Sequence, residues 1–100
     1  MPYKYILTKP QKRALEIVKE NGLTGGACFA SQMWPEYEKA TSRKKRGYNM
    51  RAGSFLARLR KLGLLAVEEH SYLAPGTGHA HYQLVYNLTR LGKVSLEEAV

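Results

Sequence analysis

Apolar residues between Asn49 and Lys61 recur every three or four positions, which is the spacing of a helix with one buried side. The apolar set is Ala52, Phe55, Leu56, Leu59 and Leu62. The same spacing places a polar and basic set on the opposite side: Arg51, Ser54, Arg58 and Lys61. Gly63 follows, where helices often end in the left-handed conformation that glycine adopts readily. The pattern predicts a helix over residues 49–62, with Asn49 as its N-cap.

Two further helices are predicted upstream. Thr8 can cap the first, Pro10 suits its first turn and Gln11 completes a capping box. Its buried side is Ala14, Leu15, Ile17 and Val18. We expect it to end at Asn21-Gly22. The second helix covers residues 27–33, with Phe29, Ala30 and Met33 facing the core, and ends at Trp34-Pro35 because the residue before proline avoids the helical region. Leu23-Thr24 is expected as a short strand and Gly25-Gly26 as a turn.

The last third of the chain changes to strand chemistry. Residues 64–72 and 81–88 are predicted as two strands of a hairpin over residues 64–88, with a Pro-Gly turn between them. The second strand alternates cleanly, so one face carries Tyr82, Leu84, Tyr86 and Leu88. Thr89 then caps a short final helix. Residues 1–7 are expected to form an arm that packs Tyr3, Tyr5 or Ile6 against the domain.

One hundred residues with 44% hydrophobic and 24% charged side chains are ordinary for a single globular domain, here residues 1–100. No apolar run is long enough to cross a membrane, and the N-terminus lacks a stretch of signal-peptide length. The single cysteine, Cys28, rules out an internal disulfide and fits a reducing compartment. We therefore expect a cytoplasmic protein without membrane partners.

Charge changes this picture most. The chain carries a net +8, and between Lys39 and Lys61 there are nine basic residues and no acid. Such a segment attracts nucleic acid through phosphate contacts and counterion release, although a solvated surface is the alternative. Residues 35–48 are predicted as a long basic connection, and the run of four cations from Arg43 to Arg46 as a loop that becomes ordered on phosphates.

The sequence predicts no enzyme, metal or cofactor. His79 and His81 alternate on a strand and could join Cys28 or His70 around zinc, but the tight ligand pairs of a structural site are missing. Cys28 is expected to be a buried thiol on the short second helix. The chain contains no glycine-rich phosphate loop and no zinc-protease motif.

Two segments resemble the winged helix-turn-helix domains of MarR-type and PadR-type regulators: SFLARLRKLGLL at Ser54–Leu65 and YNLTRLGKVSLEE at Tyr86–Glu98. The likeness covers nearly the whole chain and implies an α+β fold, with a three-helix core, a C-terminal β-hairpin wing and a short final helix. The long basic connection at residues 35–48 departs from that family.

The resemblance implies that the helix over residues 49–62 enters the major groove and that the wing meets the adjacent backbone or minor groove. The implied base-reading residues are Asn49, Arg51, Ser54 and Arg58. Phosphates would be bound by Arg43, Lys44, Lys45, Arg46, Arg60, Lys61, Thr77 and His79. Base contacts give sequence preference, whereas phosphate contacts position the protein.

The predicted function is therefore double-stranded DNA binding by a small prokaryotic, archaeal or viral transcriptional regulator. Two alternatives stay open. One is a winged-helix assembly or protein-interaction module of replication, packaging or a virion, and the other is RNA binding. A weak homodimer is left open, and no small-molecule effector is expected because no effector domain is predicted.

Overall fold

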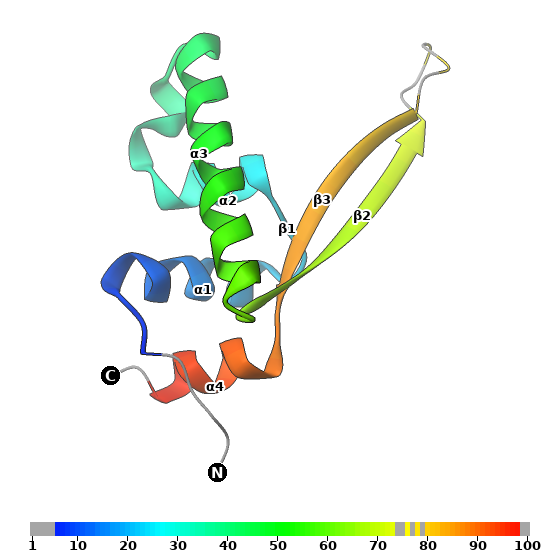
Figure 1. Cartoon of the computed structure of the whole chain (residues 1–100). Coiled ribbons are helices and arrows are strands. Elements are labelled where there is room, and N and C mark those ends of the chain that lie inside the picture. The colour runs from blue at the N-terminus through cyan, green and yellow to red at the C-terminus, as the bar shows by residue number, and fades with distance from the viewer. Residues whose placement is uncertain (1–5, 74–75, 77, 79, 99–100) are drawn as a thin grey trace.

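The computed structural model describes residues 6–73, 76, 78 and 80–98. Helices and a small antiparallel sheet alternate along the chain, giving an α+β architecture (Figure 1). The elements are α1 (Lys9–Asn21), β1 (Thr24–Gly25), α2 (Gly26–Met33), the 3₁₀ helix η1 (Pro35–Lys39), α3 (Ser42–Lys61), β2 (Leu65–Leu73), β3 (Ala80–Leu88) and α4 (Arg90–Glu98).

Helix α1 begins with the predicted capping box. The Gln11 backbone N–H donates to the Thr8 hydroxyl at 3.3 Å, and the Thr8 N–H donates to the Gln11 side chain at 2.9 Å. The helix ends at Asn21, and Gly22 follows with a φ of 73°. These local signals act within a few residues, so the predicted helix is confirmed at both ends.

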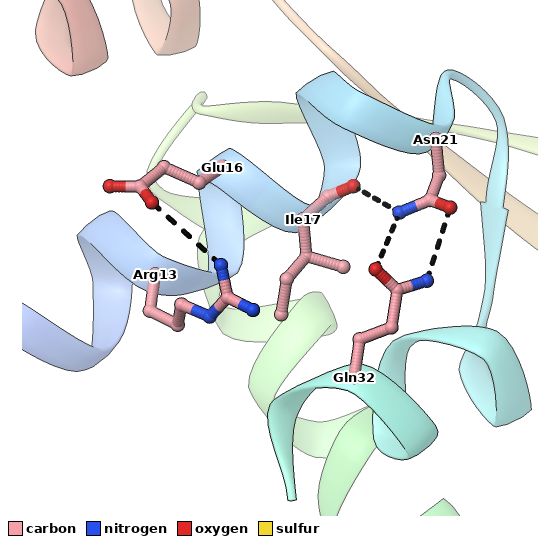
Figure 2. A network of polar contacts seen from close by, with 5 residues as sticks. All are labelled: Arg13, Glu16, Ile17, Asn21 and Gln32. Carbon is pink, nitrogen blue, oxygen red and sulfur yellow. Dashed lines mark hydrogen bonds and ion pairs between the residues drawn. The ribbon is translucent and has the colours of Figure 1, made fainter. Parts of the chain in front are cut away.

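A pair of amides joins the end of α1 to α2 (Figure 2). Asn21 Nδ2 donates to Gln32 Oε1 at 3.0 Å, and Gln32 Nε2 donates back to Asn21 Oδ1 at 3.1 Å. Asn21 Nδ2 also donates to the Ile17 carbonyl at 2.6 Å. The two amides therefore fix α2 against α1 at the surface, while apolar side chains do so beneath.

The core lies where α1, α2 and α3 meet the base of the sheet. The predicted inward residues of the three helices are buried or packed on the core, as their spacing requires. The fully buried side chains include Leu15, Ile17, Val18, Phe29, Leu56, Leu59 and Leu64. Phe55, Leu62 and Met33 are partly buried against this cluster.

The sheet has the order β1-β3-β2, with both neighbouring pairs antiparallel. Thr24 faces Tyr86, and Leu65 faces Leu88 in the registers of the two pairs. The short strand is one residue later than predicted, and Gly26 already belongs to α2, so the expected Gly25-Gly26 turn is wrong. Gly25 is buried beneath Gln83, whose side chain would collide with any Cβ at that position.

The β2–β3 hairpin confirms the two predicted strands, and only the base of its apolar face is buried. Tyr86 and Leu88 are buried, whereas Tyr82 is 68% exposed and Leu84 is 50% exposed. Figure 1 shows the reason, since the hairpin projects away from the helices that cover only its base. The helices cover too little of the sheet to bury its outer half.

The start of the described chain also differs from the predicted arm. Of the three residues named for packing this arm, Ile6 is 86% exposed and does not pack, whereas its neighbour Leu7 contacts the core. Tyr3 and Tyr5 lie outside the described residues. At the other end, Thr89 caps α4 as predicted: its hydroxyl accepts from the Gly92 N–H at 3.0 Å and donates to the Gly63 carbonyl at 2.6 Å.

The largest difference concerns the predicted basic connection at residues 35–48. It is not a loop: η1 covers Pro35–Lys39, and α3 begins at Ser42. Thr41 is the N-cap, and its hydroxyl accepts from the Lys44 N–H at 3.3 Å. Asn49 therefore lies within α3 and does not cap it. The cations from Arg43 to Arg46 stand on a formed helix and are held in register with Arg51 and Arg58.

Candidate nucleic-acid interface

Helix α3 has a core side and a solvent side in its C-terminal half, and its N-terminal half extends past the core. Ala52, Leu56 and Leu59 are buried on the core side. The implied base-reading residues Asn49, Arg51, Ser54 and Arg58 are all exposed. Of the implied phosphate-binding residues on this helix, Arg43, Lys44, Arg46, Arg60 and Lys61 are exposed and Lys45 is half-buried. The helix thus exposes basic side chains at both of its ends and at Arg51 and Arg58, and the fold does not cover them.

Three aromatic side chains, which we call the aromatic clamp, support the N-terminal half of α3. They are Trp34, Tyr37 and Tyr48. The Trp34 and Tyr48 rings stack at 5.6 Å between centroids, and Tyr37 meets Tyr48 edge-on at 6.1 Å. Trp34 and Tyr37 belong to the segment before α3, and their contacts with Tyr48 pack that segment against the N-terminal half of the helix. This half extends past the core (Figure 1).

The aromatic clamp also positions polar and charged side chains of α3. The Arg51 guanidinium lies over the Trp34 ring at 5.0 Å, and the Lys45 ammonium lies over the Tyr37 ring at 5.4 Å. The Tyr37 hydroxyl donates to Asn49 Oδ1 at 3.1 Å. Arg51, Lys45 and Asn49 are therefore held to the sides of the helix, in contrast to Arg43 and Arg46.

The Tyr48 hydroxyl donates to Glu36 Oε1 at 3.2 Å, which ties α3 to η1. Burial raises the pKa of the Tyr48 phenol above its usual range. The neighbouring Glu36 carboxylate raises this pKa further through its charge and by accepting the hydrogen bond, while Arg51 acts in the opposite direction. Tyr48 therefore stays protonated, and remains a donor, across the physiological range.

An open groove of about 970 Å³ runs beside α3. Its wall combines apolar side chains with two guanidinium groups, and it is closed on one side by the start of α1. The lining residues are Thr8, Pro10, Gln11, Met33, Trp34, Met50, Arg51, Ser54, Phe55, Arg58 and Leu59. The sequence did not predict this groove, because residues from α1, α2 and α3 form it together. The one local signal was the end of α2 at Trp34-Pro35, which indicated that the chain changes direction beside the groove.

The β2–β3 hairpin has the opposite charge character to α3. None of the chain's 16 lysines and arginines lies between Leu62 and Thr89. The hairpin instead carries Glu68 and Glu69 on its exposed surface, with His70 Nε2 3.0 Å from the Glu68 carboxylate. Thr77 and His79, the implied phosphate contacts of the hairpin, lie outside the described residues. The exposed basic side chains are thus concentrated on α3 and not on the hairpin.

The described residues contain no group of three or more histidine, cysteine or acidic side chains that could hold a metal ion. Cys28 is exposed, so its expected burial is wrong. It lies on the side of α2 that faces the surface, where its sulfur is 3.3 Å from Gln32 Nε2. Across residues 6–73, 76, 78 and 80–98, none of the helices has the length and apolar character needed to span a membrane.

Comparison with known proteins adds to this geometry. No protein-family model matches the chain, and no curated protein sequence matches it. Among solved structures, the chain is similar to BpsR of Bordetella bronchiseptica, whose structure concerns the regulation of its DNA binding by 6-hydroxynicotinic acid. The TM-score is 0.53, the identity 21%, and the match covers 92% of this chain and 55% of BpsR.

The fold is winged-helix-like. Helices α2 and α3 follow one another with η1 between them, and the β2–β3 hairpin comes directly after α3, an order consistent with such a fold. The chain spans about half the length of BpsR, and at this identity the likeness concerns the fold alone. Helix α3 is longer than its sequence pattern indicated, and the β2–β3 hairpin carries no lysine or arginine.

Proposed function

We propose that this protein binds double-stranded DNA as a transcriptional regulator and that α3 enters the major groove. The observation that carries the proposal is the basic, exposed side of α3 opposite its buried side. An α-helix fits the major groove, and cations on its solvent side neutralise phosphates on the flanking strands. The similarity of the fold to BpsR, a protein whose DNA binding is regulated, supports the same function.

In this proposal the residues of α3 divide by position. Arg43, Lys44 and Arg46 bind phosphates at the N-terminal end, and Arg60 and Lys61 do so at the other end. Arg58 and Ser54 read base edges, with Asn49 and Arg51 at the sides of the helix. Lys45 contributes less to phosphate binding because its ammonium lies over the Tyr37 ring. Thr77 and His79 are retained as contacts of the wing.

A second candidate function is supported by the wing itself. The exposure of Tyr82 and Leu84 is typical of a surface that contacts protein, and the two exposed glutamates with no lysine or arginine disfavour contact with phosphates. A winged-helix assembly module that uses the wing for protein contacts would have these features. It is distinguished from a regulator by whether binding to duplex DNA depends on sequence.

Regulation by a small molecule belongs to the description of BpsR. For the present chain we keep the expectation that no small-molecule effector is bound, and we also keep the proposed resemblance to MarR-type and PadR-type domains. The groove beside Arg51 and Arg58 is the place on this chain where an aromatic acid would meet both apolar walls and cations. An effect of such a molecule on DNA binding would contradict the expectation directly.

Selection of bound duplexes from a random pool tests the proposed function. We expect one recovered consensus sequence, bound more tightly than random duplex. Arg58→Ala should flatten the preference among sequences, whereas Lys93→Ala, an equal loss of charge on the exposed surface of α4, should leave it unchanged. Recovery of a random pool, or equal effects of the two variants, would contradict the proposal.

A further inference from the structure

Met50 is a large apolar side chain placed on the solvent side of α3. It is 70% exposed, although it lies two positions from both Tyr48 and Ala52, which face inward. Two residues correspond to about 200° of helical rotation, so Met50 points almost directly away from the core. Its exposure therefore follows from the helix geometry.

Cations stand at both ends of the line that contains Met50. Spacings of four and three residues connect Arg43, Gly47, Met50, Ser54, Ala57 and Lys61 along this outermost line. From Arg43 to Lys61 the helix rises about 27 Å, more than the roughly 12 Å width of the major groove. In the proposed complex the end cations reach the phosphates on either side, and Met50 lies between them, opposite base edges.

Two of the neighbours of Met50 on this surface, Gly47 and Gly53 at three residues on either side, are glycines, whereas Arg46 and Ser54 lie four residues away. A Cβ added at Gly47 or Gly53 would meet no other atom within 4 Å, so neither glycine is required by packing. Each weakens the helix by about 1 kcal/mol relative to alanine. With glycines three residues before and after it, Met50 is the large apolar side chain at the middle of the exposed side, and the helix backbone at these glycines can approach the bases closely.

We propose that Met50 is a specificity-determining residue that recognises the C5-methyl groups of thymine in the major groove, an inference that rests on the proposed DNA binding. The thymine methyl is an apolar feature of the major-groove edge and distinguishes thymine from the other bases there. A methionine thioether is flexible and polarisable, so it packs on such groups from several angles. The preferred sites therefore contain thymine at the positions facing the middle of α3.

The test uses the full chain and a duplex recovered by selection. Each thymine in turn is replaced by uracil, which removes one methyl group and keeps the base pairing. At a position contacting Met50, wild type should lose affinity about fourfold, the change expected for a methyl-sized apolar group. Met50→Ala should bind the thymine and uracil duplexes equally. Ile6→Ala, which truncates an exposed residue outside α3, should retain the wild-type difference.

The possible outcomes distinguish failure of the proposed role of Met50 from failure of the proposed DNA binding. The role of Met50 is overturned, and DNA binding left intact, if no uracil substitution changes the affinity of a selectively bound duplex. The same conclusion holds if uracil lowers the affinity equally for wild type and Met50→Ala. A selected site without thymine at its central positions does the same. If no duplex is bound at all, the proposed function fails and the inference falls with it. Helical content of each variant is compared by circular dichroism.

Discussion

The N-terminal half of α3 leads to a quantitative prediction about salt. Arg43, Lys44 and Arg46 are exposed on one formed helix, whereas the Lys45 ammonium lies 5.4 Å from the centre of the Tyr37 ring. Each phosphate neutralised on duplex DNA contributes about −0.9 to the slope of log affinity against log salt. Replacing the three exposed cations with serine should therefore reduce the steepness of this slope by about 2.7.

That change is large in a direct titration. Between 50 and 200 mM salt, the ratio of wild-type to triple-variant affinity should fall by about 40-fold. Lys45→Ser should leave the slope nearly unchanged, since its charge is directed at the ring and away from phosphates. Fluorescence anisotropy of a labelled duplex, repeated at several salt concentrations, measures the slope of each variant.

A matched triple variant controls for net charge. Lys19, Arg90 and Lys93 are exposed on α1 and α4, and their replacement with serine removes the same charge away from α3. This control should keep the wild-type slope apart from a small general shift. Equal slopes for the two triple variants, or a full effect of Lys45→Ser, would refute the assignment of phosphate contacts to the exposed side of α3.

Three further predictions concern the glycines Gly92 and Gly53, the Tyr48 phenol and the expected absence of an effector. Gly92→Ala should lower the free energy of unfolding by about 1–3 kcal/mol, because the new Cβ would collide with the Leu64 carbonyl; Gly53→Ala, in open space, should raise it by about 1 kcal/mol, and thermal unfolding compares the two. Because the pKa of Tyr48 is raised in the fold, its contribution to stability is present below about pH 10 and is lost as pH rises through the folded pKa; urea unfolding should show wild type weakening relative to Tyr48→Phe over that range. Addition of 6-hydroxynicotinic acid should leave duplex affinity unchanged, and a shift in the anisotropy titration would show the expectation of no effector to be wrong.

The parts of the fold that sequence predicts here are those with local signals. The capping box at Thr8, the left-handed glycine at Gly63, with a φ of 82°, and the three-and-four spacing of α1 and α3 all act within one or two helical turns. The hairpin and the cap of α4 by Thr89 are of the same kind. These signals predict where elements begin, end and face the core, because their geometry does not depend on distant residues.

The sequence pattern did not predict that the N-terminal half of α3 is helical, and the reason is physical. Residues 42–48 show no apolar periodicity, and what packs them is the aromatic clamp, whose Trp34 and Tyr37 lie before the helix. The prediction that Cys28 is buried was wrong for another reason. Helix α2 is apolar on several sides, so the spacing of its apolar residues does not show which side packs on the core. The groove beside α3 depends on the angle between helices, which local pattern does not determine.

Helix α3 is already formed without DNA, and this changes the expected free energy of DNA binding by its basic residues. A mobile basic loop would have to lose backbone freedom on binding, at about 1–2 kcal/mol per residue, or roughly 7–14 kcal/mol over residues 42–48. Here that ordering is achieved within the fold, by the aromatic clamp and by the Tyr48–Glu36 and Tyr37–Asn49 hydrogen bonds. The free energy of the proposed phosphate contacts of α3 would then not be offset by the cost of folding the segment that makes them. The aromatic clamp, which includes no implied base contact, is in this account a determinant of DNA affinity.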